Sequence, residues 1–290
     1  QPTYSIITNI DREHMDYYKS MRKLFRLFGE YTNKVPSFGK SFICLDDKNN
    51  RKLIKSIKVK NFHTYGINKK SNFFINNIIQ LRSYSLFDLK ISLPGKKIFS
   101  INRIKIPLIG HHNIRNASAA VAVSTSLGIP EKKIKEGLKK FSGVQRRFNK
   151  IFDYKGACFF DDYAHHPTEI KEVLSGVKSA YSSERIICIF QPHRISRLND
   201  LKSEFTKCFK DADEVVLCPI FTAGENIKLK FSFESFAKQL SQESKVRLYL
   251  IKDKMNLAKF VKQHVYGNKI VIGMGAGSIS SWIKELPELI

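Results

Sequence analysis

Residues 157–170 read ACFFDDYAHHPTEI, and this stretch decides the fold class. Its first six residues form an apolar run that ends in two carboxylates, which predicts a buried strand. Pro167 then takes a first-turn position where proline favours a helix, and the helical pattern continues over 168–181. Apolar side chains recur there at the spacing of one helix face: Ile170, Val173, Leu174 and Val177. A strand followed directly by such a helix predicts an α/β fold.

The same alternation of strand and helix continues toward the C-terminus. Further strands are predicted at RIICIF (185–190), EVVLCPIF (214–221), RLYLI (247–251) and KIVIGMG (269–275). Helical patterns separate them at 198–210, 233–241, 255–266 and 278–286. Such alternation is typical of a mostly parallel sheet with helices on both faces. The change of pattern places a domain boundary near residues 146–148.

The first half of the chain has a different pattern. It opens on an apparent strand, YSIITNI (4–10), and residues 20–32 have a helical pattern. Short alternating runs then predict antiparallel strands: SFICL (41–45), FHTYGI (62–67) and DLKISLPG (88–95). Two helices are predicted before the boundary, one that ends at Gly128 and one that Pro130 opens.

Composition excludes several classes of protein. The net charge of +24 invites a nucleic-acid reading, but the lysines are spread along the chain without an arginine-rich stripe. We therefore expect a solvated basic surface that attracts anionic substrates, and no nucleic-acid partner. No apolar run approaches the roughly 20 residues of a membrane span. The five cysteines form no C-x-x-C pair, which favours reduced thiols of a cytoplasmic protein over a disulfide frame or zinc site.

Polar clusters follow four of the predicted C-terminal strands: DDYAHH, QPHRISR, PIFTAGE and GMGAGS. The carboxyl ends of parallel strands meet at one edge of a sheet, and ligands bind there. Taken singly, each cluster could be a helix cap, a tight turn or a surface salt bridge. Taken together they predict one binding pocket, in which Arg194 and Arg197 could grip a carboxylate or phosphate beside His193.

The segment TNIDREHMD (8–16) offers a separate set of polar groups. Asp11, Glu13, His14 and Asp16 follow the first predicted strand. Oxygen ligands with one imidazole would suit Mg²⁺ near phosphates, whereas an exposed acidic turn is the ordinary alternative.

Seven segments together resemble the Mur ligase family in order and spacing. They are TNIDREHMD, GHHNIRNASAA, GVQRRF, DDYAHHPTEI, FQPHRISR, TAGE and GAGSIS. Mur ligases are cytoplasmic ATP-dependent amide-bond ligases of peptidoglycan synthesis, and thus serve cell-wall biogenesis, cell shape and cell division. The likeness is strongest to the member that joins L-alanine to UDP-N-acetylmuramate through an acyl phosphate. The resemblance implies ATP and Mg²⁺ as cofactors.

The resemblance also implies the domain organisation. Residues 1–146 are similar to the central ATP-binding domain, N-terminally incomplete because no G-x-x-x-x-G-K-[ST] phosphate loop occurs. Residues 147–290 are similar to the Rossmann-like C-terminal ligase domain. We expect the chain alone to be inactive unless the UDP-binding and phosphate-loop region is supplied. The oligomeric state is left open.

Site roles follow from the resemblance, position by position. His14 resembles the family's metal ligand, and His112 with Asn116 the residues that hold adenine. Arg147, less clearly Arg146, and Asp162 resemble contacts to the phosphate and ribose of ATP. The L-alanine pocket would consist of Tyr163, His165, His193, Arg194 and Arg197, of which the two histidines and two arginines are the expected catalytic residues.

The sequence departs from the family pattern at two places, and two alternative functions remain open. Ile195 stands where an aromatic residue is common, and TAGENIKLK (222–230) lacks the usual proline and glycine. One alternative is the murein-tripeptide recycling ligase of the same family. The other is a non-catalytic fragment or basic binding module. An assay that compares L-alanine with the tripeptide would distinguish the first alternative, and the sequence upstream of Gln1 the second.

Overall fold

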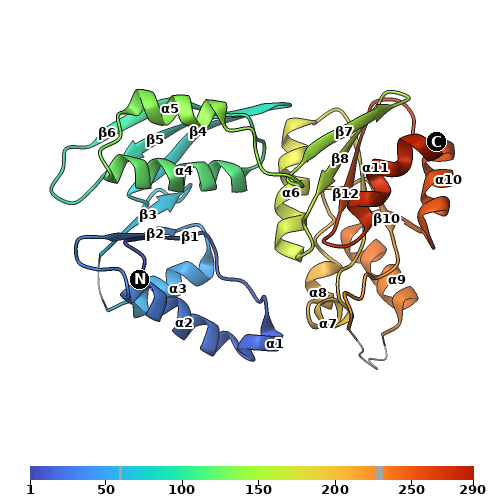
Figure 1. The fold of residues 1–290 in the computed structure, drawn as a ribbon, viewed down its shortest axis with the longest axis horizontal. Helices are drawn as coiled ribbons and strands as arrows, with labels where there is room; N and C mark the ends of the chain where they lie inside the picture. The colour runs from blue at the N-terminus through green and yellow to red at the C-terminus, as the bar shows by residue number, and fades with distance from the viewer. Residues whose placement is uncertain (59–60, 226–230) are drawn as a thin grey trace. The chain divides into compact units, whose positions relative to one another are not determined.

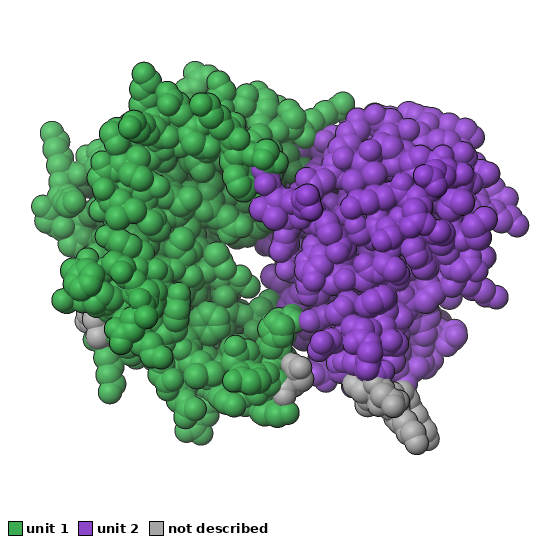
Figure 2. Space-filling model, viewed as in Figure 1, with its two compact units in different colours: residues 1–142 green, residues 143–290 purple. Residues whose placement is uncertain are grey.

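The computed structural model describes residues 1–58, 61–225 and 231–290, so the end of the TAGENIKLK segment lies outside the described residues. Its ribbon is drawn in Figure 1. The chain divides into two compact units, residues 1–142 and 143–290, which Figure 2 shows in separate colours. Each unit has its own six-stranded sheet, and each is described by itself.

The sheet of the second unit has the order β11-β10-β9-β12-β8-β7. All neighbours are parallel except the edge strand β7, which runs antiparallel to β8. The strands are β7 (Asn149–Tyr154), β8 (Ala157–Asp162), β9 (Arg185–Phe190), β10 (Glu214–Leu217), β11 (Arg247–Leu250) and β12 (Lys269–Met274). The predicted mostly parallel sheet is confirmed, whereas β7 was not predicted.

Helices cover both faces of this sheet. Successive residues of the central strands β9 and β12 are therefore buried, whichever face they point to. The helices are α6 (Pro167–Ala180), α7 (Ile195–Asp200), α8 (Lys202–Phe205), α9 (Phe233–Ser244), α10 (Lys254–His264) and α11 (Ile279–Leu289). On one face, Leu257 of α10 and Ile283 of α11 pack with strand residues such as Ile187. The predicted helix at 198–210 is wrong in detail, since two short helices, α7 and α8, occupy this region.

The sheet of the first unit has the sequential order β1-β2-β3-β4-β5-β6. Its strands are β1 (Tyr4–Ile7), β2 (Lys40–Cys44), β3 (Phe62–Gly66), β4 (Phe73–Leu81), β5 (Tyr84–Ile91) and β6 (Phe99–Ile106). Strands β1 to β4 are parallel neighbours, and β4, β5 and β6 pair antiparallel. The antiparallel prediction therefore holds for the run at 88–95 and is wrong for the runs at 41–45 and 62–67.

Burial explains that error. Four consecutive residues of β2, from Ser41 to Cys44, are buried, because helices pack on both faces of the parallel part of the sheet. Ile43 packs against Leu24 and Leu53 of α2 (Met21–Asn33) and α3 (Lys48–Ser56) on one face. On the other face Phe42 packs in the core that includes α4 (His111–Ser126) and α5 (Glu131–Lys140).

The remaining helix, α1 (Met15–Tyr18), is a single turn. Helix α3 was not predicted, whereas the helices over 20–32, up to Gly128 and after Pro130 are confirmed by α2, α4 and α5. Within the described ranges, none of the helices combines the length and the apolar character that a bilayer crossing needs.

Candidate functional site

The candidate site lies where four neighbouring strands of the second unit end. Strands β10, β9, β12 and β8 are adjacent and parallel, so the loops after them leave the sheet at the same edge. These loops carry the four polar clusters of the sequence. The structure therefore brings the clusters together, as their positions after the strands predicted.

Aromatic and imidazole rings from three of these loops form a row. The Tyr163 and His165 ring centroids are 5.0 Å apart, and those of His165 and His193 are 5.8 Å apart. The Phe221 ring stacks on His193 with the centroids 5.6 Å apart and the planes 19° apart. Phe221 was not predicted as a site residue, although it lies in the PIFTAGE segment that was.

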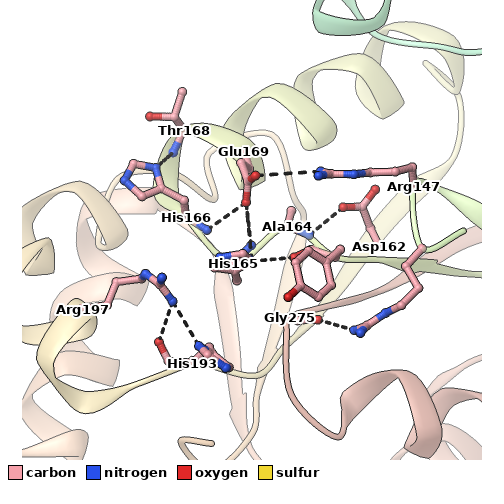
Figure 3. A network of polar contacts seen from close by, with 12 residues as sticks. Arg147, Asp162, Ala164, His165, His166, Thr168, Glu169, His193, Arg197 and Gly275 are labelled. Atoms are coloured by element: carbon pink, nitrogen blue, oxygen red, sulfur yellow. Dashed lines mark hydrogen bonds and ion pairs between the residues drawn. The ribbon is translucent and has the colours of Figure 1, made fainter. Parts of the chain in front are cut away.

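Two arginines flank this row at the start of α7. The Nη1 atom of Arg197 lies 3.1 Å from Nδ1 of His193 and donates to the His193 carbonyl oxygen at 3.2 Å (Figure 3). Arg194 adopts φ 69° and its backbone N–H donates to the carbonyl of Phe221 at 2.8 Å. The backbone thus fixes the position from which the Arg194 side chain extends.

Glu225 holds the first turn of α7 in place. Its carboxylate accepts hydrogen bonds from the backbone N–H of Ile195 and from the hydroxyl of Ser196. A carboxylate at this position satisfies donors that an α-helix leaves unpaired at its start. Glu225 of the TAGE segment therefore supports the arginines, a role that sequence reasoning did not find.

His193 is held in its neutral form. Burial lowers the pKa of His193 to about 4, and the neighbouring Arg197 adds to the effect. A neutral imidazole between arginines can accept or donate a hydrogen bond without opposing a bound anion.

The two adjacent histidines of DDYAHH have different surroundings (Figure 3). Nδ1 of His165 lies 2.9 Å from the carbonyl oxygen of Tyr163, so this ring belongs to the row. His166 is the N-cap of α6: its Nδ1 accepts from the Thr168 N–H, and the Glu169 carboxylate accepts from the His166 backbone N–H. This reciprocal capping box accounts for His166 structurally.

Asp162 is a buried link between two backbone segments. Its side chain is 2% exposed, and its two oxygens accept from the N–H groups of Phe148 and Ala164, each at 2.8 Å. Arg147 is half-exposed and places Nη1 3.8 Å from a carboxylate oxygen of Glu169. The contacts of Arg147 and Asp162 to ATP stay predictions, and Asp162 already uses both oxygens within the protein.

The glycine-rich loop after β12 packs on Gln191. Gln191 accepts from the backbone N–H of Ile279 and donates to the hydroxyl of Ser278. A side chain at Gly277 would bring its Cβ within 2.5 Å of Oε1 of Gln191 and 2.6 Å of the Phe221 ring. The GAGS segment therefore contains glycine because the loop approaches its neighbours closely.

The remaining predicted site residues belong to the first unit. His112 and Asn116 stand four residues apart near the start of α4, so they share one helix face, and Asn116 is exposed. His14 is exposed, adopts φ 55° and precedes α1. In the ranges that the structure describes, no group of three or more His, Cys, Asp or Glu side chains is arranged to hold a metal ion.

Comparison with known proteins decides the family. Residues 1–124 match the Mur ligase middle domain, and residues 146–277 match the Mur ligase, glutamate ligase domain. The chain belongs to the Mur ligase family. The UDP-N-acetylmuramate–L-alanine ligase of Pelagibacter ubique is 62% identical over 289 residues, which are 100% of this chain and 62% of that protein.

Other members of the Mur ligase family agree with this result. The protein of the same name from Chelativorans is 36% identical over 98% of this chain and 61% of its own length. A crystal structure of UDP-N-acetylmuramate-alanine ligase from Thermotoga maritima superposes with a TM-score of 0.74 at 26% identity, covering 99% of this chain and 59% of that one. The chain thus spans about 60% of the length of the curated relatives it matches.

Asp162 leads to a prediction about pH. Burial raises the pKa of this carboxyl from 3.8 to about 6 in the folded protein. A raised folded-state pKa means that the folded protein takes up this proton first as the pH falls. The charged form therefore destabilises the fold above pH 6, and this penalty disappears as the pH falls toward 4.

We expect the free energy of unfolding, relative to that of Asp162→Asn, to rise by about 2 kcal/mol between pH 7 and pH 4. Urea denaturation at four pH values, followed by the fluorescence of Trp282, measures this difference. Taking the difference between the two proteins removes the titration of the other carboxyls. Parallel pH profiles would show that Asp162 does not titrate in this range.

Proposed function

We propose that the chain is the nucleotide- and amino-acid-binding part of an ATP-dependent ligase that joins L-alanine to UDP-N-acetylmuramate in peptidoglycan synthesis. The observation that carries this proposal is the 62% identity, over the whole chain, to a relative of that name. We place the reaction in the cytoplasm, and the five cysteines, none of them in a disulfide, are typical of a protein in a reducing compartment.

The loops that follow β8, β9, β10 and β12 form the rim of the second unit. This rim has the chemical groups that bind an amino acid. Arg194 and Arg197 supply cationic forks for its carboxylate, and Tyr163, His165 and His193 border the space beside them. Positioning an amine toward an activated carboxyl needs orientation and cationic groups, and it needs no protein nucleophile. The buried thiols fit this reading, since burial raises the pKa of Cys188 and of Cys218.

ATP would supply the phosphoryl group that activates the lactyl carboxylate. Within this chain, His112 and Asn116 on one face of α4 fit the adenine, and the half-exposed Arg147 fits a phosphate. Mg²⁺ would neutralise the phosphates, and His14 supplies one exposed imidazole toward it. One imidazole does not make a magnesium site, so the remaining ligands would have to come from ATP and from residues outside this set.

A chimaera tests the proposal: this chain replaces the matching 289 residues of the Pelagibacter ubique relative. ADP release that requires both UDP-N-acetylmuramate and L-alanine is the expected result. The chain alone should release no phosphate in response to L-alanine. Activity with a murein tripeptide in place of L-alanine would favour the recycling ligase, and a chimaera that binds but does not turn over would favour a non-catalytic module.

A further inference from the structure

Asp161 is a buried charge at the end of β8 that the proposed reaction does not use. Its side chain is 1% exposed, and Oδ2 accepts a hydrogen bond from the hydroxyl of Ser280 at 2.6 Å. Its other oxygen, Oδ1, is buried without a hydrogen-bond partner in the structure. An ionised carboxylate in such a place needs a compensating cation. Arg146 provides it, with Nε 3.6 Å from Oδ2.

Arg146 joins three segments of the rim. Its Nη2 donates to the carbonyl oxygen of Gly275, after β12, at 2.6 Å. Its Cζ lies 4.7 Å from the centroid of the Tyr163 ring, and its own carbonyl oxygen accepts from the Tyr163 N–H at 2.7 Å. One residue therefore contacts both the main chain and the ring of Tyr163, and also the glycine-rich loop.

The backbone at this point is held in an uncommon conformation. Arg146 has φ 58° and Phe148 has φ 53°, in the left-handed region that costs a non-glycine residue energy. The stacked rings of Phe148 and Phe160, 4.1 Å apart, and the hydrogen bond from Phe148 to Asp162 hold the segment there. With the backbone in this conformation, the side chains of Arg146 and Arg147 lie in different surroundings.

Those surroundings separate the two arginines. The Arg147 side chain is 49% exposed and its nearest ionic partner is Glu169. The Arg146 side chain is 27% exposed; its Nη2 donates to the carbonyl oxygen of Gly275, and its charge lies beside Asp161 and over the Tyr163 ring. Arg147 is thus available to a ligand, and Arg146 is committed to the protein.

We infer that Arg146, neutralised by the buried Asp161, is a positioning residue that fixes the Tyr163 ring and the Gly275 loop at the amino-acid pocket. It does not bind the phosphates of ATP. The cation over the ring holds the aromatic wall of the pocket by a cation–π contact. That the ligand of this pocket is L-alanine rests on the proposed function; the Arg146–Tyr163 coupling does not.

The first experiment uses this chain without any substrate. Tyrosine rings are labelled with ¹³C, and the Tyr163 NMR signal is identified by its loss in Tyr163→Phe. In Arg146→Met and Asp161→Asn we expect the Tyr163 signal to move while the other tyrosine signals stay. Arg146→Lys keeps the charge and should move the Tyr163 signal less. It also serves as the test variant if Arg146→Met does not fold. Arg185→Met removes a 63%-exposed arginine at the start of β9 and should move nothing at Tyr163.

The second experiment measures kinetics in the chimaera. Arg146→Met should raise the KM for L-alanine roughly 3- to 30-fold, the range of a cation–π contact, with the KM for ATP changed less than about twofold. Arg146→Lys should restore part of the loss. A general structural defect would change both constants or the yield of folded protein, and would not show this split.

Two results would overturn the inference. A Tyr163 signal that does not move in Arg146→Met removes the coupling, whatever the substrate is. A rise in the KM for ATP alone would return Arg146 to the phosphate. A chimaera that ignores L-alanine would refute the proposed function and leave the NMR result to decide the role of Arg146.

Discussion

Replacing Arg194 by alanine in the chimaera is expected to raise the KM for L-alanine roughly 10- to 100-fold, with little change in the KM for ATP. A charge-assisted hydrogen bond to a carboxylate is worth about 1.5–3 kcal/mol, and about 1.4 kcal/mol is tenfold in affinity. Arg194 precedes α7 next to His193, and its backbone is fixed to Phe221, so the side chain starts from a defined position. Steady-state kinetics with each substrate varied in turn measures both constants.

Two matched variants show whether the effect belongs to the guanidinium. Arg194→Lys keeps the charge and loses the bidentate fork, so its KM for L-alanine should lie between those of the parent and the alanine variant. Arg185→Ala, at the opposite end of β9, should leave both constants unchanged. Equal increases in the two KM values for Arg194→Ala would mean that Arg194 supports the fold of the rim instead of holding the amino acid.

The sequence predicted the second unit closely because its strands are buried on both faces. Strands β8 and β9 begin and end where the apolar runs ACFFDD and RIICIF do. A strand covered by helices on both sides is a nearly continuous apolar run, so its approximate length can be read from the sequence. The clustering of Tyr163, His165, His193 and Arg197 follows from the same sheet, since parallel strands bring the loops after them to one edge.

Long-range contacts were not predictable from local patterns. The run SFICL was predicted as an antiparallel strand, yet β2 is parallel to both neighbours, and pairing depends on residues far along the chain. Phe221 and Glu225 become site residues only because their loop returns to residues 192–196. Gln191 becomes part of the site because the loop after β12, which ends 88 residues later in the chain at Ile279, packs against its side chain. The glycines of GAGS were the one local sign of that approach.

The glycine-rich loop itself provides the second large expected effect. Gly275→Ala should lower the free energy of unfolding of the second unit by about 2–4 kcal/mol, the range of substitutions that force an overlap in a packed region. Gly275 has φ 148°, and an added Cβ would lie 2.7 Å from the carbonyl oxygen of Gln191 and 3.1 Å from Ile279. The first of these neighbours is backbone next to the buried end of β9, so it cannot rotate away.

Trp282, the single tryptophan, lies in α11 and packs on the core of the second unit, so its fluorescence during urea denaturation reports on that unit. Gly267→Ala is the matched control, because Gly267 has φ 72° but open space where a Cβ would stand. The control carries the backbone strain without the overlap and should cost about 1–2 kcal/mol. If the two variants lose the same stability, the strain of a positive φ explains both, and the close packing of Gly275 on Gln191 adds nothing. If Gly275→Ala loses more and also weakens L-alanine binding in the chimaera, the loop that accepts the Arg146 hydrogen bond is part of the pocket.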